Sequence, residues 1–502
     1  MKKLFICVMT SLCSTFAFAD EDLVVKPAAI YGSNGTMEVV INKANTTAFQ
    51  FDVKLPAGIS VSAFGTASGD RKFENNQVDP STNTWRFLSY DEKNATFDAG
   101  TTFNVTLAAG NGANGGDAET AGILLVDPEG TGTSVDGSST NISLGAKITI
   151  PAGKNLAMVS DKNLDFTTLE AKGVKAYICA GYEIVDAEHS TFWMTRVTDV
   201  PANTPILVRG EAGDYDVPAG VGSICYPQTF MYGDATNKFA VDKSEGYKNY
   251  AVAKSTGVIG TFSNNELDAG KAYFHVPATI TPNVADAKQN FTMGKGGNLA
   301  CVSNYDLDFT QMEAQGLKAY VVTGFSKSTI WLTPVKTVPA KTPLFLRGSS
   351  EATYNVPSSA ASLVYSNMLK GNTTGSDMNL NPEEDGYTIY AMSMKTGVFG
   401  TLSGTTTFKD GKAWLPVPTT FYNSFVKPAA SRGMISESLL EEAEVIGIMA
   451  SSIGGEDNGT TGIRALGEIQ TDDAWYNLSG QRIDTPTKKG LYIKNGKKVV
   501  VK

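Results

Sequence analysis

The chain has 502 residues, of which 19% are charged, and a formal net charge of -9 at pH 7. Single hydrophobic cores stop growing at about 250–300 residues, so several domains are expected. The acidic balance argues against a general nucleic-acid binder, because such proteins need clustered Lys and Arg to displace counterions from phosphates. The 50 glycines and 10% aromatic residues are typical of β-rich, turn-rich globular domains.

Residues 1–19 have the pattern of a signal peptide. Two lysines precede a short apolar stretch, and Ala17-Phe18-Ala19 fits the small-x-small cleavage site, which predicts cleavage between Ala19 and Asp20. A lipid anchor on Cys13 is the less favoured alternative, because Leu12 is bulky. No later segment offers about 18 consecutive apolar residues, so the mature chain is expected to be exported without a membrane span.

Residues 20–151 show the period-2 alternation of half-buried strands. In "AFQFDVKLPAG", Phe49, Phe51 and Val53 point one way, while Gln50 and Asp52 point the other. Neighbouring segments repeat the pattern between glycine-rich turns. The sequence therefore predicts an N-terminal β-sandwich.

Two stretches of this region, "FQFDVKLPAGISV" and "WRFLSYDEKNATFDAGTTFNVTLAA", are similar to the cohesin-like, carbohydrate-binding-module-like sandwich of Bacteroidetes surface proteins. The resemblance implies a protein of the cell surface or medium. It also implies a sandwich that binds either an extracellular glycan or a partner protein.

The middle of the chain contains an internal duplication. "LDFTTLEAKGVKAYI" from Leu164 returns as "LDFTQMEAQGLKAYV" from Leu307, and "VPANTPILVRG" returns as "VPAKTPLFLRG". Repeat 1 is assigned to 152–292 and repeat 2 to 293–427. Each is expected to be a mostly-β domain with one short helical turn that Gly173 or Gly316 can stop. The phrases resemble a module that is common in secreted Bacteroidetes proteins.

An acidic, glycine-bearing segment at 428–473 predicts a flexible linker, with a short amphipathic helix around 439–446 as an alternative. Residues 474–502 then predict a small β unit that ends in a hairpin with an Asn-Gly turn. This tail resembles the C-terminal sorting segment of Bacteroidetes surface proteins, which implies recognition by outer-membrane export machinery, commonly the type IX system. A small capping hairpin is the alternative. The residues assigned to sorting are Tyr492, Asn495, Gly496, Val499 and Val501.

The sequence offers little for catalysis. Only two histidines exist, His189 and His275, and both are expected at the surface. The patterns of zinc proteases, phosphate-binding loops and EF-hands are absent, so no catalytic residue, cofactor or metal is predicted. Duplicated carboxylate pairs at Asp165 with Glu170, and at Asp308 with Glu313, leave a glycoside hydrolase open as a weaker alternative.

Aromatic side chains provide the candidate glycan platforms, because flat amphipathic rings stack well on sugars. Core packing is the alternative for each. The candidates are Trp85, Tyr90, Trp193, Trp331 and Trp414, the last of which aligns with Tyr273. Cys179, Cys225 and Cys301 are expected as buried thiols, with a Cys179–Cys225 bridge as the alternative.

These observations predict a mostly-β, multidomain, non-enzymatic protein exported through the periplasm to the cell surface or medium. Adhesion or glycan binding is the first functional hypothesis. A protein-binding scaffold of the cohesin type is the second, and a hydrolase is the third.

Overall fold

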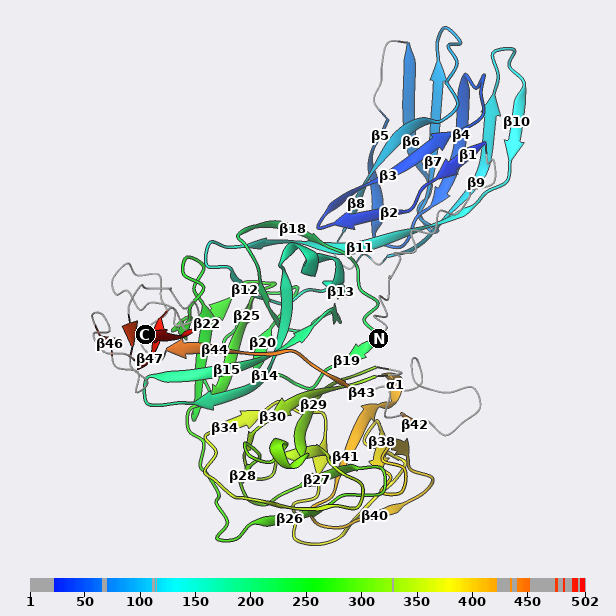
Figure 1. Cartoon of the computed structure of the whole chain (residues 1–502). Coiled ribbons are helices and arrows are strands. Elements are labelled where there is room, and N and C mark those ends of the chain that lie inside the picture. Colours follow the sequence, from blue (N-terminus) through cyan, green and yellow to red (C-terminus); the bar gives the residue numbers. More distant parts are fainter. Residues whose placement is uncertain are drawn as a thin grey trace. The chain divides into compact units, whose positions relative to one another are not determined.

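The computed structural model describes residues 22–65, 70–110, 113, 115–326, 329–421, 434–435, 440–451, 475–476, 482–483, 490–494 and 497–501. Strands dominate these ranges (Figure 1), which confirms the predicted mostly-β, multidomain fold. The chain divides into two compact units, 1–148 with 216–219, and 149–215 with 220–502. Within the described ranges, no helix is long and apolar enough to cross a membrane.

The strands of the first unit are β1 Leu23–Val25, β2 Ala28–Tyr31, β3 Asn34–Ile41, β4 Ala48–Lys54, β5 Ile59–Phe64, β6 Arg71–Asp79, β7 Thr84–Asp91, β8 Thr101–Ala109, β9 Gly116–Val126, β10 Gly132–Val135 and β11 Ser139–Ile150. They follow the order β5-β8-β3-β2-β11-β9-β4-β7-β6, with β1 beside β3 and β10 beside β9.

This strand path folds over onto itself as a sandwich. Phe64 on β5, at one end of the path, packs edge-on against Phe51 of β4 and Phe87 of β7, near the other end. Phe49 and Phe51 are at most 1% exposed and Gln50 lies on the other side of the strand, as the alternation predicts. Facing aromatic rings therefore form the core.

Repeat 1 contains β12 Asn155–Met158, β13 Leu164–Asp165, η1 Thr167–Lys172, β14 Lys175–Ile184, β15 His189–Val197, β16 Asp199–Val200, β17 Ile206–Arg209, β18 Gly213–Val217, β19 Ile224–Cys225, β20 Met231–Gly233, β21 Phe239–Ala240, β22 Tyr247–Val252, β23 Ile259–Thr261, β24 Glu266–Leu267, β25 Ala272–Pro277 and β26 Gln289–Thr292. The element η1 is a 3₁₀ helix, and Gly173 ends it with a φ of 76°.

Repeat 2 contains β27 Asn298–Val302, β28 Leu307–Asp308, η2 Glu313–Gln315, β29 Lys318–Ser326, β30 Ile330–Val335, β31 Thr337–Val338, β32 Pro343–Arg347, β33 Thr353–Val356, β34 Leu363–Tyr365, β35 Lys370–Gly371, β36 Met378–Leu380, β37 Glu383–Glu384, β38 Tyr387–Met392, β39 Phe399–Thr401, β40 Thr406–Phe408, β41 Ala413–Pro418 and α1 Thr419–Phe421. Its short helix η2 ends at Gly316, which has a φ of 82°.

Equivalent strands of the two repeats pair in the same register. Gly181 of β14 lies opposite Trp193 of β15, and Gly324 of β29 lies opposite Trp331 of β30. Arg209 and Arg347 likewise take the same place, opposite the first residue of β14 and of β29. The duplicated sequence segments thus form strand pairs with the same register in both repeats.

The repeats exchange strands with each other. β19 of repeat 1 pairs with β29 of repeat 2, while the equivalent β34 of repeat 2 pairs with β14 of repeat 1. The repeats also touch through side chains, because the hydroxyls of Thr195 on β15 and Thr333 on β30 are 3.0 Å apart. Apart from residues 216–219, both repeats accordingly belong to one compact unit.

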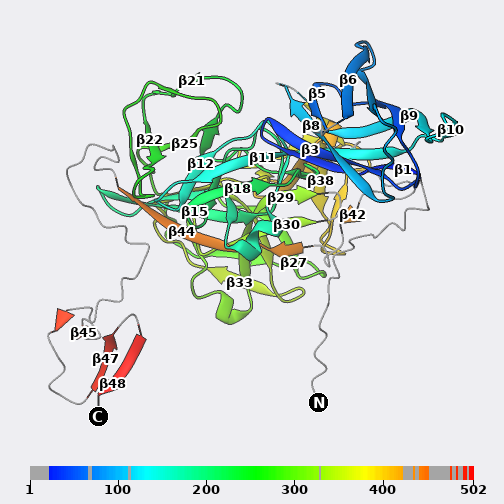
Figure 2. The same cartoon turned by 90° about the horizontal axis from the view of Figure 1, so that it is seen from above.

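Part of the segment expected to be a flexible linker or a short helix consists of strands: β42 Met434–Ile435, β43 Leu440–Glu442 and β44 Val445–Ser451. β43 pairs with β30, and β44 fills the place between β15 and β23. This segment is extended rather than helical or free because β15, β23 and β30 have backbone N–H and C=O groups that need partners. β43 and β44 supply those hydrogen-bond partners. Figure 2 shows β44 in orange, extended along β15.

The C-terminal unit has four strands, β45 Trp475–Tyr476, β46 Arg482–Ile483, β47 Gly490–Lys494 and β48 Lys497–Val501, in the order β46-β45-β47-β48. β47 and β48 pair from Gly490↔Val501 to Lys494↔Lys497, as the predicted hairpin requires. Tyr492, Val499 and Val501 belong to these strands. Asn495 and Gly496, like the predicted cleavage site Ala19–Asp20, lie outside the described residues.

Candidate binding surfaces

The outer face of β9, β4, β7 and β6 carries apolar side chains. Leu124, Gln50, Leu88 and Glu74 stand side by side across these four strands. Leu88 lies between the buried Phe87 and Ser89, so its side chain points outward, where it is half-buried. Leu124 is 37% exposed. The leucines flank Gln50 and form the apolar centre of an otherwise polar sheet face.

Ion pairs lie along one side of this centre. Arg86 binds the carboxylate of Asp52 through two hydrogen bonds, from Nε at 2.8 Å and from Nη2 at 2.9 Å. On the neighbouring positions, Lys54 Nζ lies 3.1 Å from Glu119. A bidentate Arg–carboxylate pair has a defined geometry, so these charges hold the rim of the face in place. An apolar centre with a polar rim is the usual anatomy of a protein interface.

The opposite outer face of the sandwich has a different composition. Its outward positions on β3 and β8 include Thr36, Thr102 and Asn104, all exposed. Ser60 and Ser62 continue the pattern on β5 and donate hydrogen bonds to the backbone of β8. Small hydroxyl side chains of this kind offer no apolar anchor to a partner.

A cleft of about 450 Å³ opens at the end of the sandwich, lined in part by Arg71, Phe73, Phe97 and Phe103. The Arg71 guanidinium lies 3.6 Å from the centre of the Phe97 ring. It also donates hydrogen bonds to the carbonyls of Thr47 and Ala95. These contacts tie β6 to the segment after β7, which is a structural role.

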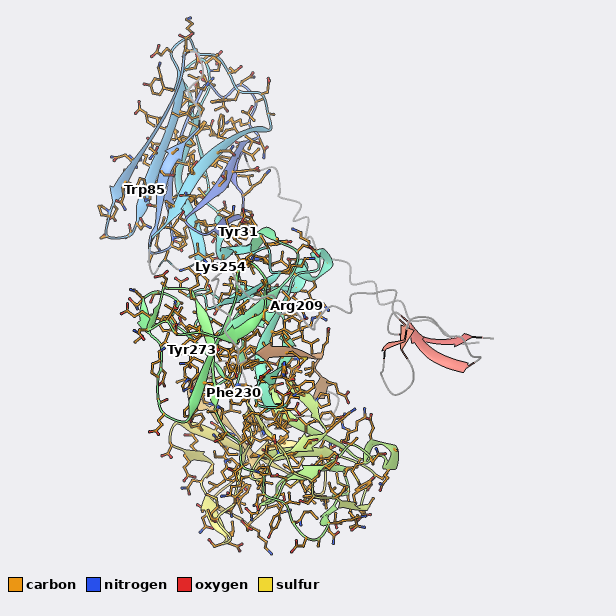
Figure 3. All side chains as sticks on the ribbon, turned by 90° about the vertical axis from the view of Figure 1, so that its left-hand side faces the viewer. Tyr31, Trp85, Arg209, Phe230, Lys254 and Tyr273 are labelled. Carbon is orange, nitrogen blue, oxygen red and sulfur yellow. The ribbon has the colours of Figure 1, made fainter. Side chains whose placement is uncertain are left out.

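The aromatic candidates of the first unit are engaged with their own chain. Trp85 is labelled in Figure 3. Its ring packs against the sandwich core, and its Nε1 donates a hydrogen bond to Asn83 Oδ1 at 3.1 Å. Tyr90 lies on the outer face beside the leucines, half-buried, and its hydroxyl donates to Glu74 at 3.3 Å. Of the two, Tyr90 is the one that faces outward.

The aromatic candidates of the repeats lie mostly in packed positions. Trp414 is 8% exposed and meets Phe408 edge-on, and Tyr273 is 2% exposed. Trp193 is half-buried and donates its Nε1 hydrogen to Glu183 at 3.1 Å. Trp331 is half-buried as well and lies against Gly324. The structure therefore does not bring the five candidates together at one surface.

One histidine differs from expectation. His189 is half-buried, with 38% of its side chain exposed, and bonds to Asp186, whereas His275 is only 5% exposed. Its ring stacks on Tyr247, and its Nδ1 lies 2.7 Å from Asn249 Oδ1. Burial lowers the pKa of His275, partly offset by the charge of Asp242.

The duplicated carboxylates have local partners. Asp165 and Asp308 each accept a hydrogen bond from a backbone N–H two residues later, at 2.8 Å. Glu170 bonds to Arg196, and Glu313 lies 3.4 Å from Lys318. Among the described residues, no group of three His, Cys, Asp or Glu side chains could hold a metal ion.

The three cysteines are free thiols, so the alternative Cys179–Cys225 bridge is not formed. Cys179 and Cys301 are buried, as expected, and Cys225 is half-buried. Desolvation raises the pKa of Cys301 to about 12, which keeps the thiol protonated and unreactive.

The two leucines of the outer face were missed by the sequence reasoning. Their signal was present in the alternation, because Leu88 falls on the outward side of a strand whose inward residues are Phe87 and Ser89. Only the pairing of β9 with β4 and of β4 with β7 brings Leu124 and Leu88 into one row. Single-strand patterns do not contain that information.

No family model matches the chain. No curated protein matches it either. Among solved structures it is similar to the cohesin module of a family 33 glycoside hydrolase from Clostridium perfringens, with 10% identity, a TM-score of 0.22, and coverage of 25% of this chain and 97% of that one.

Two other cohesins show the same extent of likeness. A non-cellulosomal cohesin from Archaeoglobus fulgidus is 18% identical, with a TM-score of 0.20 and coverage of 25% of this chain and 91% of that one. A cohesin from a Clostridium thermocellum cohesin–dockerin complex is 11% identical, with a TM-score of 0.20 and coverage of 25% and 93%.

Proposed function

We propose that this chain is an exported, non-enzymatic protein whose sandwich domain holds a partner protein on the outer face of β9, β4, β7 and β6. The observation that carries the proposal is the row formed by Leu124, Gln50 and Leu88. Two outward leucines on a sheet face lose apolar exposure when a partner covers them, which stabilises the complex by about 25 cal/mol per Å² buried.

The ion pairs beside the leucine row favour a specific partner rather than nonspecific apolar association. The face carries both signs of charge. Arg86 and Lys54 supply the positive charges, and Asp52 and Glu119 supply the negative ones. Such a mixture of charges favours binding of a partner with complementary charges and disfavours a partner that places like charges together. Export follows from the signal-peptide pattern and the tail, which remain expectations from the sequence.

Glycan binding is the second candidate function, and Tyr90 favours it. Its half-buried ring lies on the same outer face as the leucines, diagonally across from Glu74, which accepts a hydrogen bond from its hydroxyl. An aromatic ring beside a carboxylate can stack on a sugar and accept its hydroxyls. The other candidates are engaged within their own domains. Trp85 and Trp414 pack against cores, Trp193 donates a hydrogen bond to Glu183, and Trp331 is half-buried against Gly324.

A capture experiment with matched variants tests the proposal. The mature protein, its Leu124→Glu variant and its Thr36→Glu variant on the opposite face are immobilised and exposed to an envelope extract of the host, and each is also applied to a glycan array. We expect one protein to be retained by the wild type and by Thr36→Glu but lost with Leu124→Glu. Equal retention of that protein by the wild type and both variants would contradict the proposal. Binding of the wild type to a glycan on the array, lost in a Tyr90→Ala variant, would also contradict it.

A further inference from the structure

We propose that residues 440–451, here called the strap, occupy a strand-addition groove that also accepts the strap of a second copy of this chain. The strap comprises β43 and β44. It crosses from repeat 2, where β43 runs parallel to β30, to repeat 1, where β44 runs antiparallel to β15. The inference concerns self-association through the repeats and is independent of the sandwich face.

The groove is defined by two strand edges of repeat 1. β44 pairs with β15 over seven positions, from His189↔Ser451 to Thr195↔Val445. On its other side it pairs with β23 at Ile259↔Ala450 and Gly260↔Ser451. Withdrawal of the strap would leave both edges unpaired. Unpaired edges are templates for another strand, and the best-matched strand is the same one from another copy.

Two glutamates give the strap its register. Glu442 accepts a hydrogen bond from Tyr320 at 2.5 Å and lies 3.5 Å from Lys318. Two residues later, Glu444 lies 3.2 Å from Lys175 and 2.7 Å from Arg196. Lys318 and Lys175 are equivalent residues of the duplicated "KAY" phrase. A Glu-Ala-Glu sequence therefore recognises the same lysine once in each repeat.

The contacts of the strap are those of a separable element. Its ion pairs are between side chains that are 27% to 46% exposed, and such pairs contribute about 0–1 kcal/mol each. Ala450 is buried, whereas Ile446 and Ile448 are only partly buried against the core and Met449 is 40% exposed. Elements with few buried apolar contacts open at a lower free energy than the core.

Exchange between equivalent modules already occurs inside this chain. β19 of repeat 1 completes the sheet of repeat 2, and β34 of repeat 2 completes that of repeat 1. Two tyrosines make matching hydrogen bonds. Tyr226, directly after β19, donates to the Asp199 carbonyl at 2.7 Å, and Tyr365, the last residue of β34, donates to the Thr337 carbonyl at 2.9 Å. A strap exchanged between two copies would form the contacts it forms in one, so only chain entropy opposes it.

Cysteine pairs across the groove test the proposal on the full mature chain. Thr191 and Met449 are register partners on β15 and β44. Thr191→Cys and Met449→Cys are made singly and together in a Cys225→Ser background. The double variant should close its disulfide within one chain. An equal mixture of the two single variants, oxidised at rising concentration, should yield a disulfide-linked dimer containing one of each.

A matched control separates strap exchange from random collision. Thr36→Cys, exposed on the first unit, is mixed with Met449→Cys and should give at least tenfold less dimer. The proposal is overturned if the double variant closes within one chain while the mixed single variants give no more dimer than this control. Light scattering on the wild type, refolded at the same concentrations, provides an independent measurement. A dimer fraction that rises with concentration supports exchange, and a monomer throughout contradicts it.

Discussion

Gly181 and Gly324 each lie beneath a tyrosine ring that comes from the other repeat. A Cβ placed on Gly181 would meet the Tyr365 ring at 3.0 Å, and one on Gly324 would meet the Tyr226 ring at 3.2 Å. Each glycine also follows an irregularity in its strand ladder. The missing side chain at these two positions therefore permits the close approach by which the repeats join.

Gly181→Val should lower the free energy of unfolding of the second unit by about 1–3 kcal/mol, because overpacking forces the tyrosine or the strand to shift. The measurement is denaturant unfolding followed by tryptophan fluorescence. Gly404→Ala is the control, since nothing lies within 4 Å of its added Cβ and it should be near neutral. If the free energy of unfolding of Gly181→Val equals that of the wild type, the Tyr365 ring does not pack tightly enough on Gly181 to exclude a side chain.

The two glutamates of the strap make a pH-dependent contribution. The Tyr320 hydroxyl and then Lys318 lower the pKa of Glu442, and Arg196 with Lys175 lowers that of Glu444, both from the usual value of 4.5. A lowered folded-state pKa means that the stabilisation is complete above about pH 4.5 and is lost as the pH falls through the folded-state value.

The E442Q/E444Q variant should therefore melt below the wild type at pH 7, by a small margin because the pairs are solvent-exposed. The difference should shrink as the pH falls below 4.5 and then disappear. Differential scanning fluorimetry across this range measures it. A difference that stays constant with pH would mean that the glutamates act through packing rather than charge.

At the scale of elements, the strap is the part that sequence reasoning could least anticipate. Its glutamates suggested a solvated linker or helix, because local composition was all that could be read. Its partners lie far away in sequence, on β15, β23 and β30. By contrast, β4 was predictable to the residue, since Phe49 and Phe51 alternate with Gln50 and Asp52 and the core is fixed by that alternation.

Two truncations distinguish the strap from the tail. A chain ending at 473 keeps β43 and β44 and should melt within about one degree of the full-length protein. A chain ending at 439 loses the strap and should melt several degrees lower, because two strand edges of repeat 1 become unpaired. Thermal melting followed by tryptophan fluorescence compares the three. Equal melting of both truncations would show that the strap contributes nothing to the fold.

The longer truncation also tests the sorting hypothesis. In the native host, a chain ending at 473 should accumulate in the periplasm, because the tail resembles a sorting segment. Fractionation of the host cells measures its location. Normal arrival at the surface would leave the four-stranded C-terminal sheet as a structural cap and would contradict the sorting role.

At the scale of the whole molecule, duplication has produced one body rather than two. The repeated phrases predicted two similar domains. The reciprocal pairing of β19 with β29 and of β34 with β14 depends on contacts between repeats, which neither repeat's own pattern contains. The leucine face likewise depends on contacts between strands. Leu124 and Leu88 form a row only when β9, β4 and β7 pair in register.

Site-specific photocrosslinking in the native host tests the central claim, that the leucine face of the sandwich binds a partner protein. A photoreactive amino acid replaces Leu124 in one strain and Thr36 in a second, and the cells are irradiated and the adducts identified by mass spectrometry. We expect a single abundant protein adduct at position 124 and none at position 36. No adduct at position 124, or the same adducts at both positions, would contradict it.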